Sequence, residues 1–151
     1  MRVMIRKLFE KLLKVNDTPE RTALAFAIGV FLSFSPFLGL HTALGLLVAF
    51  LFGLNRVAVI VGVYTNTPWT MAPFYAFATY CGQWFYTLPA DMPFHIKDMA
   101  GWDFWRKLFS NWTSLWPLIM PTVIGSTVLA VLAAAIAYPI SLRLIRAYRK
   151  Q

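Results

Sequence analysis

The chain has 151 residues, of which 59% are hydrophobic, 17% are aromatic and only 13% are charged. This composition is typical of an integral membrane protein and excludes an ordinary soluble domain. The formal net charge of +8 comes from basic residues at the edges of apolar tracts. A nucleic-acid surface would interleave exposed basic residues with aromatics, so no nucleic-acid partner is expected. The length predicts a single membrane domain over residues 1–151.

Residues 1–16 predict a basic amphipathic helix that lies on the cytoplasmic leaflet of the membrane. The alternative is a partner-binding helix. One face of this helix carries Met1, Ile5, Leu8, Leu12 and Val15. Basic residues precede the first apolar tract and return in the tail, residues 143–151. Under the positive-inside rule both termini are expected in the cytoplasm, and membrane lipids are expected partners.

Two long uncharged tracts, residues 22–55 and 57–90, are separated only by Arg56. About 20 helical residues cross a bilayer, so each tract is too long for one span, and each is broken near its middle by proline. Residues 18–88 therefore predict two broken helical hairpins. The expected helices cover residues 19–34 and 41–52 in the first tract, and 57–65 and 74–88 in the second. The hairpins are re-entrant if their arms are short, or consist of complete spans; the sequence leaves both open.

The two tracts share a local pattern. Gly29-Val30-Phe31 precedes Pro36 much as Gly62-Val63-Tyr64 precedes Pro68, with one residue fewer between glycine and proline. Interrupted apolar segments at corresponding positions of two halves are typical of a transporter site between repeats. Chance recurrence of glycine and proline in an apolar chain is the alternative.

The last third of the chain predicts a polar loop and an aromatic interface helix over residues 89–117, followed by a transmembrane helix over residues 118–142. Together these elements predict an all-α integral membrane protein with amphipathic interface helices at its N-terminus and centre. The number of complete crossings stays open, because one of the earlier hairpins, or the last helix itself, can be re-entrant.

The membrane tracts offer little for catalysis. They contain no carboxylate pair, no His/Cys cluster and no Ser/His/Asp arrangement, and Cys81 is the only cysteine. The sequence therefore predicts no enzyme, no cofactor and no metal site. The polar breaks are better candidates, because helix ends present N–H groups and a positive dipole end to anions. The expected substrate-binding residues are Ser35, Pro36, Gly39, His41, Thr42, Asn55, Arg56, Asn66, Pro68 and Thr70. For Arg56 a simple interfacial anchor is an equal alternative.

The motifs at these breaks resemble a family of bacterial membrane proteins, the domain of unknown function DUF2062. They are Thr18-Pro19-Glu20, Ala27-Ile28-Gly29-Val30, the run from Pro36 to Thr42, Asn55, Asn66, Pro68-Trp69-Thr70 and Tyr75. The resemblance implies a small protein of the bacterial inner membrane, sometimes joined to glycosyltransferase-like domains, and it supplies no activity.

Three functions are consistent with these observations. The first is a small, homo-oligomeric transporter or lipid translocator for an anionic headgroup such as a polyprenyl phosphate. The second is a non-catalytic scaffold for a glycosyltransferase or another envelope-building enzyme. The third is a small ion or solute channel. A wet cavity at the breaks separates the first and third from the second.

Overall fold

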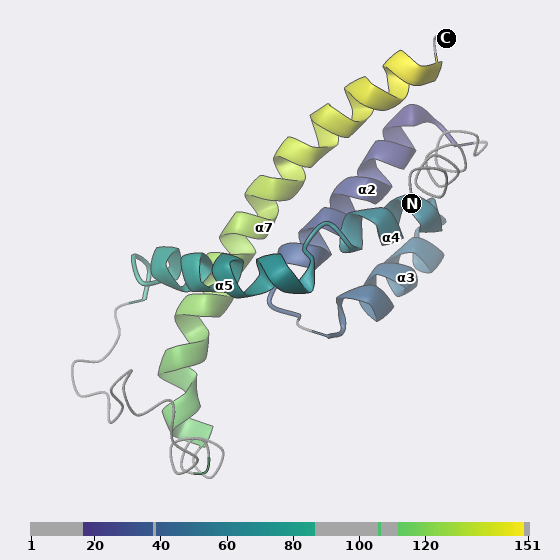
Figure 1. Ribbon diagram of the computed structural model, residues 1–151. Helices are drawn as coiled ribbons and strands as arrows, with labels where there is room; N and C mark the ends of the chain where they lie inside the picture. Colours follow the sequence, from purple (N-terminus) through teal and green to yellow (C-terminus); the bar gives the residue numbers. More distant parts are fainter. Residues whose placement is uncertain (1–16, 38, 87–105, 107–111, 150–151) are drawn as a thin grey trace. The chain divides into compact units, whose positions relative to one another are not determined.

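The structure is a computed structural model that describes residues 17–37, 39–86, 106 and 112–149. The described residues form helices and no strand (Figure 1), which confirms the all-α prediction. The helices are α2 (Pro19–Phe34), α3 (His41–Leu51), α4 (Arg56–Val63), α5 (Pro68–Gly82) and α7 (Trp112–Arg149). The amphipathic helix predicted over residues 1–16 and most of the segment 89–117 lie outside the described residues.

Local signals set the ends of α2 as the sequence predicts. The Thr18 hydroxyl accepts a hydrogen bond from the backbone N–H of Arg21 at 3.3 Å, and Pro19 begins the helix. Such an N-cap satisfies a backbone donor that has no partner within the helix, and proline there loses no internal bond. The helix ends at Phe34, immediately before Ser35 and Pro36. The first predicted break is therefore confirmed.

The turn between α3 and α4 also uses local signals. Gly53 adopts a positive φ of 59°, which glycine tolerates best. The Asn55 side-chain oxygen accepts from the backbone N–H groups of Val57 at 3.0 Å and Ala58 at 3.2 Å. Asn55 is therefore the N-cap of α4.

The second break is shorter than predicted, because α5 begins at Pro68 and contains Pro73 within it. The expected helix start at residue 74 was wrong. Thr67 and Thr70 explain the difference. The Thr70 hydroxyl accepts from the Thr67 N–H at 2.9 Å, and the Thr70 N–H donates to the Thr67 carbonyl at 2.9 Å. These reciprocal bonds start the helix at Pro68, five residues before the proline that had suggested a non-helical segment.

The helix α7 has 38 residues and a length of about 57 Å. It contains the predicted span 118–142, and it also includes residues 112–117 and the basic residues up to Arg149. Among the described residues, Ile119–Arg149 is the one stretch long and apolar enough to cross a membrane.

The chain divides into two compact units. The first contains Met1–Met71 and Thr127–Gln151, and the second contains Ala72–Ser126. Within the first unit α2 packs mainly on α4, and α3 packs on both. Within the second unit a Cβ on Gly82 would lie 1.7 Å from the Pro121 carbonyl oxygen, and one on Gly125 would lie 1.8 Å from the Ala78 oxygen. The two helix backbones therefore touch, and only glycine fits at these positions.

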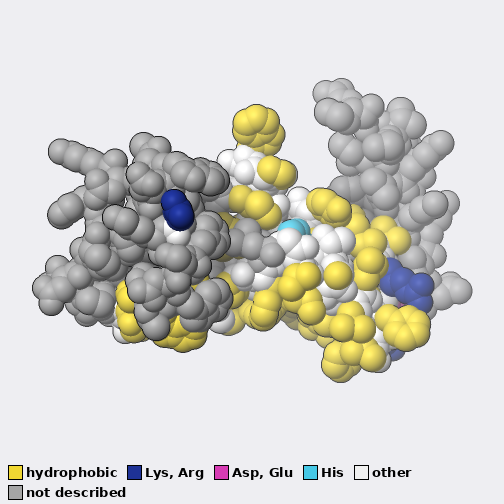
Figure 2. Space-filling model, turned by 90° about the horizontal axis from the view of Figure 1, so that it is seen from below, with side chains coloured by type: hydrophobic (Ala, Val, Ile, Leu, Met, Phe, Trp, Pro, Cys, Tyr) yellow, Lys and Arg dark blue, Asp and Glu magenta, His cyan; other side chains and the backbone are white. Residues whose placement is uncertain are grey.

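Small side chains lie inside and large apolar side chains lie outside, which is the reverse of the arrangement in a soluble protein. Small residues fill much of the interior, including Ala23, Ala25, Ala27, Ala49, Ala58, Ala78 and Ala130. Large apolar side chains lie outside: Trp69 is 91% exposed, and Phe50, Leu51 and Phe52 are about two-thirds exposed. Figure 2 shows such side chains over much of the described surface. This pattern is typical of helices that pack through small residues and face lipid with large ones.

Candidate functional site

The helices α2 and α4 cross at two glycines. A Cβ on Gly29 would lie 2.2 Å from the Val59 carbonyl oxygen, and a Cβ on Gly62 would lie 2.3 Å from the Phe26 oxygen. Neither carbonyl can move without breaking its helix, so both positions require glycine. The α2–α4 pair has one end on each side of this crossing, and polar residues gather at both ends. We call them the break end, at residues 33–42 and 64–70, and the arginine end, at residues 17–21 and 50–56.

At the break end Asn66 joins the two helices. Its backbone N–H donates to the Ser33 hydroxyl at 3.0 Å, and its side-chain amide donates to the Ser33 carbonyl at 3.2 Å. Its side-chain oxygen accepts from the Thr70 hydroxyl at 2.8 Å. Both Ser33 and Asn66 are almost fully buried. The Asn66 side chain therefore serves as a structural link between segments 33 residues apart.

The first break is open by comparison. Ser35 is buried, and its hydroxyl donates to the Leu32 carbonyl at 2.7 Å. Gly39 has a φ of 83°, and a Cβ built on it would meet no atom within 4 Å. The N-cap position of α3 is occupied by Leu40, which provides no side-chain cap. His41 and Thr42 follow and are half-buried. The backbone N–H groups of Leu40 and His41 both donate to the Phe37 carbonyl at 3.1 Å. The N-terminus of α3 thus has a backbone cap but no side-chain cap, and it lies beside an exposed glycine.

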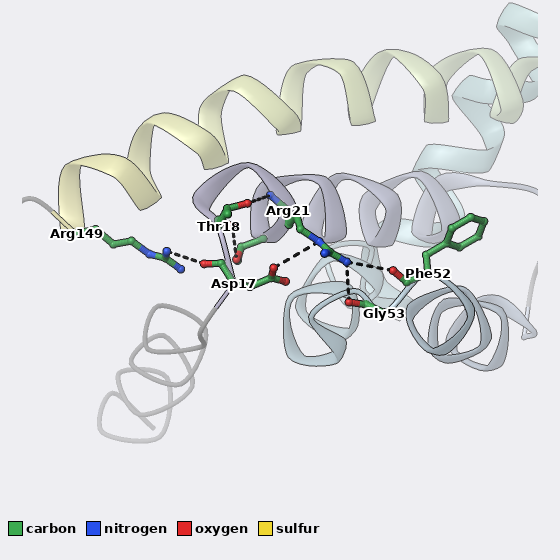
Figure 3. A network of polar contacts seen from close by, with 7 residues as sticks. Asp17, Thr18, Arg21, Phe52, Gly53 and Arg149 are labelled. Carbon is green, nitrogen blue, oxygen red and sulfur yellow. Dashed lines mark hydrogen bonds and ion pairs between the residues drawn. The ribbon is translucent and has the colours of Figure 1, made fainter.

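Contacts at the arginine end close the turn after α3. The Arg21 guanidinium donates to the carbonyls of Phe52 at 3.3 Å and Gly53 at 3.1 Å, and lies 3.5 Å from the Asp17 carboxylate (Figure 3). Arg21 is in the first turn of α2, whereas Phe52 and Gly53 follow α3. The C-terminal end of α3 therefore lies beside the N-terminal end of α2, so the two helices run in opposite directions.

The last turns of α7 join the same end. The Arg146 guanidinium donates to the Glu20 carboxylate at 2.6 Å, and that of Arg149 donates to the Asp17 carbonyl at 2.7 Å. The hydrogen bond from Arg146 holds the pKa of Glu20, at this polar end, below its usual value. These contacts are exposed, so each one contributes little to stability.

The predicted site residues divide between the two ends. Asn55 and Arg56 lie at the arginine end, separated from Asn66 by α4, whose 8 residues span about 12 Å. Asn55 caps α4, and its buried side-chain nitrogen has no hydrogen-bond partner among the residues that the structure describes. Arg56 is exposed, with its guanidinium carbon 5.7 Å from the centre of the Phe50 ring. The other predicted residues lie at the break end, namely Ser35, Pro36, Gly39, His41, Thr42, Asn66, Pro68 and Thr70.

A comparison of the sequence with protein families decides the chain's relationships. A family model described as "Uncharacterized protein conserved in bacteria (DUF2062)" matches residues 2–151. The chain belongs to the DUF2062 family. No curated protein and no solved structure matches this DUF2062 chain. Within the described residues of this DUF2062 protein, no group of three or more His, Cys, Asp or Glu side chains could hold a metal ion.

Sequence reasoning missed several contacts in this DUF2062 protein, among them the bonds between Asn66 and Ser33. The Gly29–Gly62 crossing was foreshadowed only by the repeated Gly-Val-aromatic pattern, which gives no indication that the glycines touch. The bonds of Arg21 to Phe52 and Gly53 had no local signal, because more than 30 residues separate the donor from the acceptors.

Proposed function

We propose that this protein is a small translocator of the bacterial inner membrane. It carries a lipid or solute with an anionic headgroup, for example a polyprenyl phosphate. The observation that carries the proposal is the position of the break end. From Arg21 to Ser33 the helical rise gives about 18 Å, and from Arg56 to Val63, the last residue of α4, about 11 Å. With the arginine end at one edge of a hydrocarbon core about 30 Å thick, the break end lies near the bilayer midplane.

Polar and non-helical backbone near the midplane must be buried in protein or line a water-filled cavity. Thr65, Thr67 and Thr70 are exposed in the described part of the chain, as is Gly39. Broken helices that end at this depth are the usual place for a transporter's substrate site. The hydroxyls of these threonines bond to the backbone or to neighbouring side chains. A polar path beside the break end would accommodate them together with the exposed backbone at Gly39.

The chemistry of the first break suits an anion. The positive dipole end of α3, which lacks a side-chain cap, faces the break, and His41 and Thr42 begin that helix. The His41 ring can supply an N–H donor, and Gly39 allows close approach of a headgroup. Arg56 lies at the arginine end, where it fits an anionic lipid headgroup at the membrane surface and not the midplane site.

The arrangement in the membrane follows from the same reading. The described charges of the first unit gather at the arginine end, so this end faces the cytoplasm under the positive-inside rule. In this reading α2 and α3 form a re-entrant hairpin, because their 16 and 11 residues are too few for complete crossings. The protein then needs further copies of itself to enclose a polar path, so we propose a homo-oligomer.

The test is translocation in liposomes by full-length protein. We expect that purified protein moves a fluorescent polyprenyl phosphate or phosphatidylglycerol analogue between leaflets, and that His41→Ala with Thr42→Val slows this movement at least tenfold without lowering the midpoint of thermal unfolding. Thr79→Val is the matched control, because the Thr79 hydroxyl bonds to Thr122 in the second unit. Wild-type rates from the double variant would reject the site.

A scaffold for an envelope-building enzyme, such as a glycosyltransferase, is the second candidate, and the hydrogen bonding of Asn66 favours it. Both the oxygen and the nitrogen of the Asn66 side chain are hydrogen-bonded within the protein. This is expected if the break has only a structural role and binds no substrate. Cysteine labelling in a Cys81→Ala background separates the two functions. Labelling of Thr67→Cys by a membrane-impermeant reagent in intact vesicles supports a wet path, and labelling only after unfolding supports the scaffold. Electrical conductance without lipid movement would instead indicate a channel.

A further inference from the structure

The burial pattern repeats at an interval of 33 residues. The two buried residues of α3 are Gly45 and Ala49, and the two of α5 are Ala78 and Gly82. Adding 33 to the residue numbers of the first pair gives the residue numbers of the second pair. Both pairs are small residues one helical turn apart, so α3 and α5 each present one narrow face for close contact.

The same interval relates α2 to α4. Ala25, Gly29 and Ser33 are buried on one face of α2 at a spacing of four residues. Their counterparts 33 residues later are Ala58, Gly62 and Asn66, which are also buried. Thr22 and Asn55, both buried polar residues at the start of these faces, are another such pair. The interval therefore holds over both helices of each half, although few residues are identical between the halves.

Contacts between the halves obey the same relation. Gly29 meets Gly62, and the two close approaches are reciprocal, since each glycine lies against the carbonyl three residues before the other. Farther along, Ser33 meets Asn66. Equivalent residues thus meet at successive positions, which requires α2 and α4 to run in the same direction about an approximate two-fold axis between them.

We propose that residues 22–53 and 55–86 are two copies of one sequence repeat with two helices each, and that the Gly29 face of the first copy and the Gly62 face of the second are the same surface, by which the copies contact each other. The second helices of the repeats have different neighbours, since Gly45 of α3 lies against Val59 and Val63 whereas Gly82 of α5 lies against Pro121. The α2–α4 crossing is then a dimer interface contained in one chain. The two copies differ at their breaks. In the second copy Asn66 bonds to both Ser33 and Thr70, whereas the first copy carries the exposed Gly39. This inference goes beyond the proposed function and does not depend on it.

Disulfide cross-linking in the full chain tests the register. In a Cys81→Ala background, Ala25→Cys with Ala58→Cys, and separately Ser33→Cys with Asn66→Cys, should form intramolecular disulfides on mild oxidation. The control is Ser33→Cys with Ala58→Cys, which would pair only if the helices ran in opposite directions about the two glycines. Cross-linking of the control, or of neither equivalent pair, overturns the proposal.

An exchange of equivalent residues tests the symmetry itself. Asn66→Ser alone removes the amide that bonds to the Ser33 backbone, and should lower the midpoint of thermal unfolding. Adding Ser33→Asn places the amide on the other helix, where the two-fold relation directs it at the backbone of residue 66. We expect the double variant to regain at least half of the lost midpoint. No recovery would show that the two positions are not equivalent. Both readouts are independent of lipid movement, so a protein that fails to translocate still decides this proposal.

Discussion

The two ends of the α2–α4 pair are held by different kinds of contact. At the arginine end, exposed charged side chains bond to carbonyls and carboxylates, as Arg21 does to Gly53 and Arg146 does to Glu20. At the break end, buried neutral groups of Ser33 and Asn66 bond to each other. Charged pairs are inexpensive where water can solvate them, and neutral amides are preferred where it cannot. The contrast supports our proposal that the arginine end faces water and the break end lies within the bilayer.

The largest effect is expected at the break end. Asn66→Ala should destabilise the protein by about 3 kcal/mol, because it leaves the buried Ser33 carbonyl without its amide donor and removes the acceptor of Thr70. Thermal or denaturant unfolding in detergent micelles measures this. Thr67→Ala, at an exposed neighbouring position, is the control. If Asn66→Ala costs no more than the control, the link between α2 and α4 does not hold the break end.

A smaller effect is expected at the arginine end. Arg21→Leu removes the bonds to the carbonyls of Phe52 and Gly53, and should destabilise by about 1 kcal/mol, since exposed contacts of this kind are weak. Arg143→Leu is the control, because it removes another exposed arginine, one that lies on α7. A loss for Arg21→Leu equal to that for Asn66→Ala would remove the distinction between the two ends.

An effect of opposite sign is expected at the first break. Leu40→Ser places a hydroxyl at the N-cap position of α3. Residue 40 has a φ of −97° and a ψ of −11°, so it must move to extended backbone before the hydroxyl can cap the helix, and the net stabilisation should be about 0.5 kcal/mol. The same hydroxyl would occupy the helix end where we place the headgroup, so translocation in liposomes should fall. A variant that is more stable and equally active would argue against this helix end as the binding site.

The smallest effect is expected from Glu20. Its pKa is lowered in the folded protein, so its contribution to stability is complete above the usual value of 4.5 and is lost as the pH falls through the folded-state pKa. Unfolding midpoints measured between pH 7 and pH 3 should show a slight acid-side decrease that Glu20→Gln removes and that high salt weakens. An unchanged pH dependence in Glu20→Gln would exclude the Arg146 pair as its source.

The ends of the helices were readable from the sequence wherever a cap or proline acts on its own neighbours. Thr18, Pro19 and Asn55 fix their helix starts through contacts within three residues. The second break was misread because Pro73 suggested a non-helical segment, whereas the bonds between Thr67 and Thr70 begin the helix earlier. The candidate residues at the breaks could be chosen from the sequence because polar groups are conspicuous in an apolar tract. Their division between the break end and the arginine end could not be predicted from it.

The sequence by itself determined the all-helical character of the described residues, the ends of α2, α3 and α4 to within two residues and the gathering of charge outside the apolar tracts, because these depend on composition and on neighbours along the chain. Only the tertiary structure decided that Gly29 lies on Gly62, that Asn66 bonds to Ser33, and that Arg21 closes the turn after α3. These contacts join residues more than 30 positions apart, and the sequence contains no local signal for which distant group will satisfy a given donor or fit a given glycine.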